Sequence, residues 1–246
     1  TIISLTKHVK KYIVSVRFMT PIEKSNINII SYNLYHNNAS KDLAHLAEEY
    51  SVDIFCLQEA DSSELPEKIG NLKIAGSTDK NRLDLVIYYN PTKFRLVGTK
   101  AFVLERSAHD LIMSPSNQRL LAAKLISKDS DKPLVIASFH GAPLTDINRK
   151  RKRQIREAHT VLREFGGDDP TIMTGDYNYP FFKKNLEKVI GLQGYEMALS
   201  DKFTYARALP GRYDFVTYSD AIVTDVLTLP KGLSDHRPIL IKATDL

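Results

Sequence analysis

The sequence contains a single cysteine, Cys56, among its 246 residues. One thiol cannot form an internal disulfide or a cluster of thiolate metal ligands, so both are excluded. Cys56 lies in the apolar run of residues 54–57, and we expect it to be a small buried hydrophobic side chain. Without disulfides the fold must be held by its core, and the cellular compartment is left open.

Long apolar runs, repeats and low-complexity tracts are also missing. No stretch approaches the roughly 20 uncharged residues that a membrane span needs. Hydrophobic residues make up 43% and charged residues 26% of the chain, which is ordinary for a globular protein and excludes a disordered or collagen-like chain. Because no linker divides the chain, its 246 residues predict one large domain.

Acidic residues are outnumbered by basic ones. The chain has 29 Asp and Glu against 34 Lys and Arg, which gives a formal net charge of +5. A basic protein suits a polyanionic partner, and both nucleic acid and an anionic lipid or membrane surface qualify. We expect the protein to be a monomer.

Residues 1–24 differ in texture from the rest, and we treat them as a segment separate from a domain at 25–246. Their apolar positions are spaced by three and four, as in a basic amphipathic helix: Ile2, Leu5, Val9, Tyr12, Val16 and Met19. Such a helix either packs against the domain or lies on a membrane surface as the tail of a removed anchor. Since the first residue is Thr1, we expect a processed or truncated product, and a soluble domain that is either exported or anchored through a missing N-terminal segment.

Short β-rich runs dominate from residue 26 onward, and most are too short to be buried helices. They cover residues 27–34, 54–57, 83–89, 120–126, 134–139, 171–174, 213–218, 222–229 and 239–241. Helical patterns cover residues 41–50, 146–165 and 183–189. Strands that alternate with a few longer helices predict an α/β sandwich with the helices outside.

The longest predicted helix carries five consecutive basic residues at 149–153. At about 100° per residue they go right round the helix, so they cannot form one basic face. Arg151 falls on the apolar stripe, and we expect its stem to lie along the core and its head to reach solvent.

Polar side chains follow several of the predicted strands. They are Asn33, Glu59, His140, Asp176 and Asn178, Asp214, and Asp235 with His236. Strand ends hold side chains on a rigid rim, where sheet proteins commonly place their sites. Carboxylate and amide oxygens without thiolates suit a hard cation, Mg²⁺ or its substitute Mn²⁺.

The order of these residues resembles the endonuclease/exonuclease/phosphatase family, whose deoxyribonuclease I-like members pair Gly-Asp-(aromatic)-Asn with a Ser-Asp-His near the C-terminus. Here the segments are Gly-Asp176-Tyr-Asn178 and Ser-Asp235-His236, and the resemblance runs from residue 26 to the end. It implies a four-layer α/β/β/α sandwich, with two mixed β-sheets flanked by helices, and a Mg²⁺-dependent phosphoester cleavage site at one edge.

The resemblance also implies roles for single residues. Glu59 is similar to the principal metal ligand of the family, with Asn33 beside it and Asp235 joining the same shell. Asp214 is similar to the carboxylate that orients His236, whose imidazolium would face a phosphate.

Of the remaining family positions, Asp176 is similar to the residue that aligns or deprotonates the attacking water. His140 and Asn178 resemble phosphate-binding groups. We leave the assignment of acid and base among His140, Asp176 and His236 open.

The substrate is harder to predict, because this fold serves several phosphoesterases. The segment Phe-His140-Gly-Ala-Pro143 is similar to one in pancreatic-type deoxyribonucleases, but Ala60 and Asp61 stand where that subgroup has a DNA-contacting Arg. Arg119 is either a replacement phosphate contact or a solvated edge residue. Tyr179, in a loop with Phe181 and Phe182, is placed either to stack on bases or to contact a lipid.

Three functions follow from these observations. The first is a nuclease that cleaves DNA or RNA, as an endonuclease or an exonuclease, by metal-activated attack of water on phosphate. The second is a phosphoinositide phosphatase or a sphingomyelinase-like lipid phosphodiesterase. The third, a non-catalytic polyanion-binding module, is disfavoured because no core chemical residue is missing.

Overall fold

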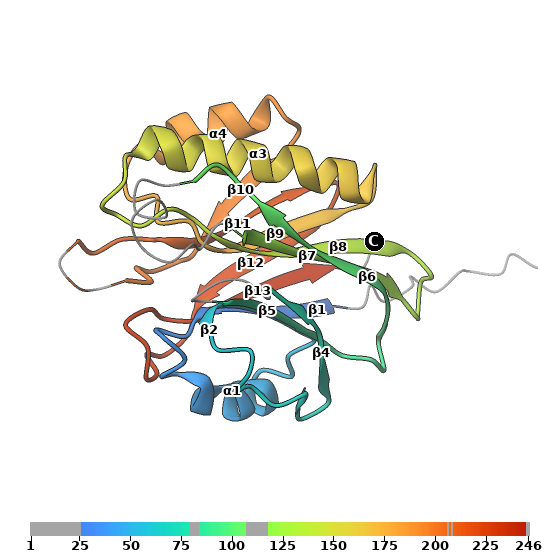
Figure 1. The fold of residues 1–246 in the computed structure, drawn as a ribbon. Helices are drawn as coiled ribbons and strands as arrows, with labels where there is room; N and C mark the ends of the chain where they lie inside the picture. The colour runs from blue at the N-terminus through green and yellow to red at the C-terminus, as the bar shows by residue number, and fades with distance from the viewer. Residues whose placement is uncertain (1–25, 79–83, 107–117, 206, 208, 245–246) are drawn as a thin grey trace, which may run out of the picture.

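Two β-sheets packed face to face form the centre of the molecule, and the helices lie on their outer faces (Figure 1). The structure, a computed structural model, describes residues 26–78, 84–106, 118–205, 207 and 209–244. The helix expected within residues 1–24 lies outside this range. No helix in the described ranges is both long and apolar enough to cross a membrane.

The first sheet has seven strands. In order across the sheet they are β12 (Ile222–Thr228), β13 (Ile239–Thr244), β1 (Asn26–Asn33), β2 (Ile54–Ala60), β5 (Asp84–Tyr89), β4 (Leu72–Ser77) and β3 (Lys68–Ile69). β1 runs parallel to β2 and antiparallel to β13, so the sheet is mixed.

The second sheet has six strands. They are β10 (Glu196–Leu199), β11 (Asp214–Ser219), β9 (Thr171–Asp176), β8 (Pro133–His140), β7 (Gln118–Ser127) and β6 (Phe94–Val103). β8 and β9 are parallel, while β9 and β11 are antiparallel. This sheet is therefore mixed as well.

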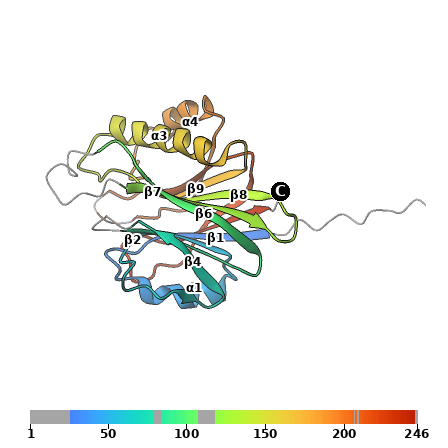
Figure 2. The same cartoon turned by 45° about the vertical axis from the view of Figure 1, so that its right-hand side comes forward.

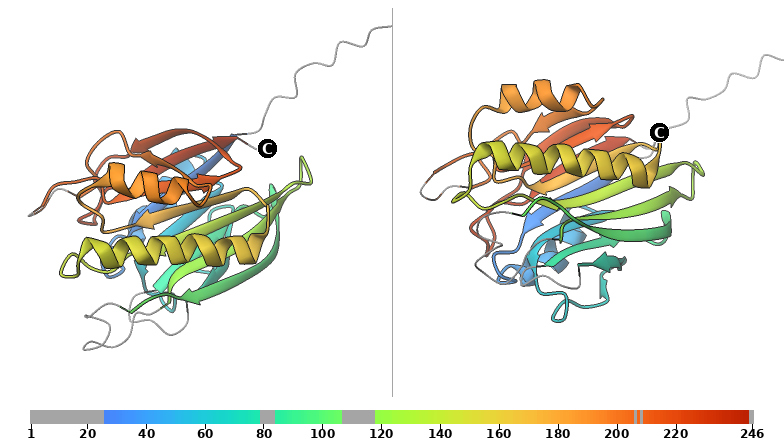
Figure 3. Two further views of the ribbon diagram at one scale, coloured as in Figure 1. Left: turned by 90° about the horizontal axis from the view of Figure 1, so that it is seen from above. Right: turned by 45° about the horizontal axis from the view of Figure 1, so that its top comes forward.

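The helices form the two outer layers (Figures 2 and 3). A 3-10 turn η1 (Ser40–Asp42) leads into α1 (Leu43–Glu49) on the first sheet. α3 (Asn148–Gly166) and α4 (Lys183–Gly191) both cover the second sheet. The expected four-layer arrangement is confirmed.

Three apolar layers hold these four structural layers together, because the central strands are apolar on both faces. In β2, Ile54 and Cys56 point into the core between the sheets, whereas Phe55 and Leu57 pack with the side chains of α1. The third layer joins α3 and α4 to the second sheet through residues such as Leu162. The thiol of Cys56 is fully buried, as expected, and burial raises its pKa.

The predicted helices are found with their ends moved by up to two residues, but four strands are additional to the prediction: β3, β4, β6 and β10. β6, for example, lies at a sheet edge, and only Phe94 and Phe102 of its ten residues are buried, with Lys, Arg and Gly in its sequence. An edge strand of that composition lacks the apolar run that marks a central strand.

Arg151 corrects one expectation about α3. The residue does lie on the buried stripe, but its head does not reach solvent, since only 3% of its surface is exposed. Its guanidinium instead donates to the carbonyl oxygen of Pro143 at 2.7 Å and to Oδ1 of Asn148 at 2.7 Å. Burial with its hydrogen bonds satisfied removes the need to reach water.

Candidate active site

Three strands of the second sheet place polar side chains in one row. His140 ends β8, Asp176 ends β9 and Asp214 begins β11. The register pairs His140 with Asp176 across the parallel strands and Asp214 with Asp176 across the antiparallel strands. Because laterally paired residues point to the same face, the three side chains meet at one edge.

The facing sheet contributes Asn33, the last residue of β1, and Glu59, near the end of β2. In a regular strand Gln58 and Glu59 would point to opposite faces. The register of β2 shifts between Leu57 and Ala60, and Glu59 has a positive φ of 51°. This irregularity lets both side chains face the second sheet, as bulges near active sites often do.

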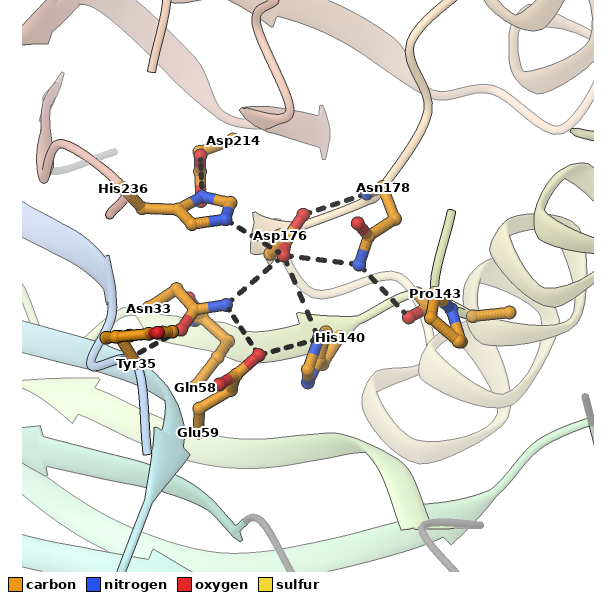
Figure 4. Close-up of polar contacts among 12 residues, drawn as sticks. Asn33, Tyr35, Gln58, Glu59, His140, Pro143, Asp176, Asn178, Asp214 and His236 are labelled. Atoms are coloured by element: carbon orange, nitrogen blue, oxygen red, sulfur yellow. Dashed lines mark hydrogen bonds and ion pairs between the residues drawn. The ribbon is translucent and has the colours of Figure 1, made fainter. Parts of the chain in front are cut away.

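Hydrogen bonds and close charges join the two groups across the sheets (Figure 4). Nδ2 of Asn33 donates to Oε1 of Glu59 at 3.2 Å and to Oδ2 of Asp176 at 3.2 Å. Nε2 of His140 lies 3.8 Å from each of the same two oxygens. The site is therefore built from both sheets at once.

His236 reaches this site from the loop before β13. Its Nδ1 lies 2.8 Å from Oδ2 of Asp214, and its Nε2 lies 3.7 Å from Oδ2 of Asp176. Ser234 fixes the loop, since its hydroxyl donates to the carbonyl of Asn33 at 2.7 Å and accepts from the amide of His236 at 3.0 Å. The imidazole is thus held between two carboxylates.

Asn178 lies next to Asp176 because the chain turns sharply there. Asn178 has a φ of 49°, and its amide donates to Oδ1 of Asp176 at 2.9 Å while Nδ2 donates to Oδ2 at 3.2 Å. Gly175 has a φ of 151°, and a Cβ there would collide with the carbonyl oxygen of Phe139. Glycine before Asp176 therefore allows β8 and β9 to approach closely at the site.

Burial and the neighbouring charges set the protonation states of the central pair. Burial raises the pKa of Asp176 to about 7, with support from Asp214 and Glu59 and against the opposing effect of His236. Burial alone would lower the pKa of His236, but the carboxylates of Asp214 and Asp176 outweigh the effect of burial and raise the pKa to about 10. At neutral pH His236 is therefore an imidazolium, and Asp176 is divided between its two states.

On the other side of the site, burial lowers the pKa of His140 to about 4, so its imidazole is neutral. Burial alone would raise the pKa of Glu59, but His140, Asn33 and His36 lower it. With His140 neutral, the pKa of Glu59 stays low through the amide of Asn33, which donates to its carboxylate. The hydrogen bond from Asn33 is the effect on Glu59 that does not depend on His140.

Two groups of residues have ligands that suit a divalent cation. One oxygen or nitrogen atom each of Asp176, Asp214 and His236 lie within 4.8 Å of one another, and all three residues are buried. Glu59 and Asn33 form the other group, and the Glu59 side chain keeps 17% of its surface exposed. In the first group Oδ2 of Asp214 is engaged by His236, while its buried Oδ1 has no hydrogen-bond partner among the described residues. We favour the second group because Mg²⁺ keeps several waters that need open space.

Not every residue singled out in the sequence joins the cluster. Asp235 lies 3.4 Å from Nη1 of Arg207, and in the described part of the chain it makes no hydrogen bond or ion pair with Asn33 or Glu59. Its carboxylate is thus placed at the rim, outside the group that we favour for the metal.

The two residues expected to contact substrate, Arg119 and Tyr179, are buried, with 5% and 2% of their surfaces exposed. Nη1 of Arg119 donates to the carbonyls of His140 and Gly141, both at 3.1 Å. In this structure Arg119 supports the backbone beneath His140, and Tyr179 packs in the core below α3.

Several residues at the site had not been singled out. His36 lies 3.8 Å from Glu59, and the Arg207 guanidinium lies 5.0 Å from the centre of the Tyr35 ring. Tyr35 and His36 come shortly after Asn33 and have positive φ angles of 50° and 54°. No sequence pattern predicts these backbone angles. Ser234 was within the Ser-Asp-His segment, so its position in a motif was the signal available for it.

Comparisons with known proteins agree with this geometry. Residues 30–236 match the Endonuclease/Exonuclease/phosphatase family. The chain is 28% identical over 154 residues to Protein angel of Drosophila melanogaster, covering 58% of this chain and 43% of that protein. It is 28% identical over 145 residues to Nocturnin of the same fly, covering 51% of this chain and 21% of that protein. The matches therefore span less than half the length of these curated relatives.

Solved structures show the same fold at lower identity. An endonuclease/exonuclease/phosphatase from Bacteroides vulgatus superposes with a TM-score of 0.73 at 15% identity, over 89% of this chain and 99% of the other. D. rerio TDP2 complexed with single strand DNA product gives a TM-score of 0.68 at 16% identity, over 89% and 99% of the two chains. At these identities the likeness concerns the fold alone.

Proposed function

Because the chain belongs to the endonuclease/exonuclease/phosphatase family, we propose that it is a divalent-metal-dependent phosphodiesterase and that its substrate is nucleic acid. The observation that carries the proposal is the row of His140, Asp176 and Asp214 that meets Glu59 and Asn33 at one edge. A cationic His236 and an Asp176 of near-neutral pKa suit the hydrolysis of a phosphate ester by general acid–base catalysis and charge stabilisation.

Mg²⁺ or Mn²⁺ would be held by Glu59 and Asn33. The carboxylate of Glu59 is a ligand that such hard cations prefer, and Oδ1 of Asn33 would join it by leaving the backbone amide of Tyr35, which donates to it at 2.9 Å. The three carboxylates of Glu59, Asp176 and Asp214 also crowd negative charge that a cation relieves. When bound, the cation withdraws charge from a phosphate oxygen.

The remaining chemistry belongs to the side chains. Asp176, in its ionised fraction, accepts a proton from the attacking water as the water oxygen bonds to phosphorus. His236 directs Nε2 toward the same space and donates to a phosphate oxygen, while Asp214 holds Nδ1. Nδ2 of Asn178 and the neutral imidazole of His140 are donors for the remaining phosphate oxygens, and solvent protonates the leaving oxygen as its bond to phosphorus breaks.

Nucleic acid is supported as the substrate by two observations. The chain carries a net charge of +5. Basic side chains can neutralise several phosphates of a long nucleic acid at once, which strengthens its binding. D. rerio TDP2, which shares the fold, was crystallised with a single strand DNA product. A lipid phosphodiester is the second candidate, because Phe181 and Phe182 keep 53% and 75% of their surfaces exposed near Asn178.

The test is to incubate the protein with end-labelled DNA and RNA strands, phosphoinositides and sphingomyelin, with excess Mg²⁺ or with excess EDTA. We expect strand cleavage in Mg²⁺ that stops in EDTA and is absent in Asp176→Ala. Full cleavage in EDTA would remove the metal from the proposal. Turnover of sphingomyelin or phosphoinositide without turnover of nucleic acid would move the assignment to the lipid enzymes.

A further inference from the structure

A hollow of about 520 Å³ lies on the outer surface between α3 and α4, outside the catalytic cluster. It is lined by the first half of α3 and by the loop and first turn that lead into α4. α3 and α4 lie on the same outer face of the second sheet (Figure 3). The loop begins at the active site, since Tyr179, which lines the hollow, directly follows Asn178.

Positive charge is concentrated on the α3 side of the hollow. Arg149, Lys152 and Arg156 are spaced by three and four residues, so they project from one side of the helix. Among the described residues, no carboxylate pairs with these three cations, whereas Arg153 beside them pairs with Glu105 at 2.6 Å. Repelling cations with no counter-charge are stabilised by an anion that binds between them.

An aromatic ring stands on the opposite side. Phe182 keeps 75% of its surface exposed and has a left-handed backbone, with φ 62° and ψ 34°, immediately before α4. Large side chains rarely adopt that conformation, which is retained where surrounding contacts enforce it. Two hydrogen bonds hold the backbone around Phe182. Nδ2 of Asn148 donates to the carbonyl of Phe181 at 3.3 Å, and Nζ of Lys183 donates to the carbonyl of Tyr179 at 2.5 Å.

From these contacts we propose that the hollow binds one nucleotide of a single-stranded nucleic acid whose scissile phosphate lies in the active site. The base stacks on Phe182, and the backbone phosphate lies among Arg149, Lys152 and Arg156. The proposal rests on the proposed function and adds to it a binding position outside the reaction centre.

The shape and lining of the hollow favour a nucleotide over a lipid surface. A membrane is contacted by protruding apolar groups, whereas this site is concave and is lined by the amides of Asn148 and Asn185. Nδ2 of Asn185 can hydrogen-bond to the edge of a base that is stacked on a neighbouring ring, whereas the amide of Asn148 is already used by Arg151 and by the carbonyl of Phe181. Rings that stack on bases also tolerate any sequence, so we expect weak base preference here.

The experiment measures binding of a fluorescently labelled single-stranded oligonucleotide by anisotropy, in EDTA so that no cleavage occurs. Phe182→Ala should weaken binding about tenfold, because the base can no longer stack on the ring. Arg149→Gln combined with Arg156→Gln should reduce the slope of log K against log salt by about 0.7 for each phosphate that is no longer neutralised. Leu192→Ala, at the far end of α4, and Lys188→Gln, also exposed, are the matched controls and should bind as the wild type does.

Unchanged binding by Phe182→Ala, with a thermal midpoint equal to that of the wild type, would overturn the proposal. So would wild-type protein that does not bind the oligonucleotide. If Phe182→Ala lost binding to vesicles of phosphatidylglycerol but not to the oligonucleotide, the hollow would be a lipid-contacting surface instead. Hydrolysis of bis(p-nitrophenyl) phosphate by the wild type tests the active site separately, so failure of the proposed function is distinguished from failure of this one.

Discussion

At the scale of single residues, the chemistry depends on how Asp214 holds His236. The imidazole of His236 is 9% exposed, and its Nδ1 is 2.8 Å from a carboxylate that is 1% exposed. Neither residue is stable in its charged form alone, because a buried carboxylate needs a donor and a buried imidazolium needs a counter-charge. The two side chains should therefore act as one unit.

We predict that Asp214→Asn and His236→Ala each reduce turnover by a similar factor of about 10²- to 10⁴-fold, as general acid–base groups do. The double variant should lose little more than the worse single variant, because residues that act together are not additive. Steady-state kinetics of the three variants on a chromogenic phosphodiester measure this. Losses that multiply in the double variant would mean that the two side chains work independently.

A second prediction concerns Glu59, which lies at the end of a strand and is hydrogen-bonded by Asn33. Glu59→Gln should weaken Mg²⁺ binding by at least about tenfold, because an amide replaces the only charged ligand in that group. Isothermal titration calorimetry gives the affinity, and Glu48→Gln on the exposed side of α1 is the matched control.

Unchanged affinity in Glu59→Gln would transfer the metal to the buried group of Asp176, Asp214 and His236. Reduced affinity in both variants would indicate a non-specific effect of charge. The thermal midpoint of Glu59→Gln is expected to stay near that of the wild type, since its side chain is not part of an apolar layer.

Which site residues could be predicted follows from where they lie on the chain. Asn33, His140 and Asp176 each end an apolar strand, and the end of a strand can be read from a run of buried residues. Arg119 could not be placed, because whether an Arg at a strand edge points outward or hydrogen-bonds the backbone beneath a neighbour depends on the loop packed against it. The burial of Tyr179 could not be predicted either, because it too depends on how the loop after Asn178 packs.

At the scale of elements, α3 contains a buried histidine that serves packing rather than the site. His159 stacks on Tyr195 with ring centres 3.8 Å apart, and its Nε2 lies 2.9 Å from Oγ1 of Thr217. Burial lowers the pKa of His159 to about 3, against a smaller opposing effect of Gln193. The helix is therefore docked through a neutral imidazole.

That pKa gives a prediction about stability. Between pH 6.5 and 3 the unfolded chain protonates His159 and the folded chain does not, so protons favour unfolding and stability falls as the pH falls. From pH 7 to pH 5 this residue should cost about 2 kcal/mol in the free energy of unfolding. Urea unfolding at the two pH values measures the loss.

His159→Phe is the control for this prediction, because a phenyl ring keeps the stacking on Tyr195 and cannot titrate. Thr217 keeps its contact with the hydroxyl of Tyr177, at 3.1 Å. The variant should lose about 2 kcal/mol less than the wild type between the same pH values. Equal losses in both proteins would assign the pH dependence to other groups.

Elements were predicted well where the pattern was strong. α3 was found because its buried residues recur every three to four positions along the helix. β10 was missed because its four residues are all at least partly exposed, and β4 because only its first residue is buried. Tertiary pairing, which the sequence does not show locally, turns such stretches into strands.

At the scale of the whole molecule, the excess of positive charge gives a further prediction. If the substrate is nucleic acid, the affinity should fall steeply as salt is raised, since each neutralised phosphate releases counterions. Binding of an oligonucleotide in EDTA, followed by anisotropy over a series of NaCl concentrations, gives the slope. A flat dependence would indicate a small or lipid substrate, and substituting potassium glutamate for NaCl is the control for specific chloride effects.

The architecture as a whole was predicted through the order of motifs, because those motifs occur at the strand ends of one particular sandwich. Pairing was beyond reach of the local pattern: β1 pairs with β13, from the opposite end of the described chain. Glu59 and Asp176 likewise come from different sheets, so their proximity depends on how the sheets pack.

The position of β13 has a consequence for folding during translation. β13 is inserted between β12 and β1, and the loop before it carries Ser234 and His236. During translation β1 is made before β13, so the edge of β1 that pairs with β13 stays open until this last described strand has been made. Until β13 is made, the growing chain lacks both His236 and the strand that covers this edge of β1, and an uncovered strand edge can mispair.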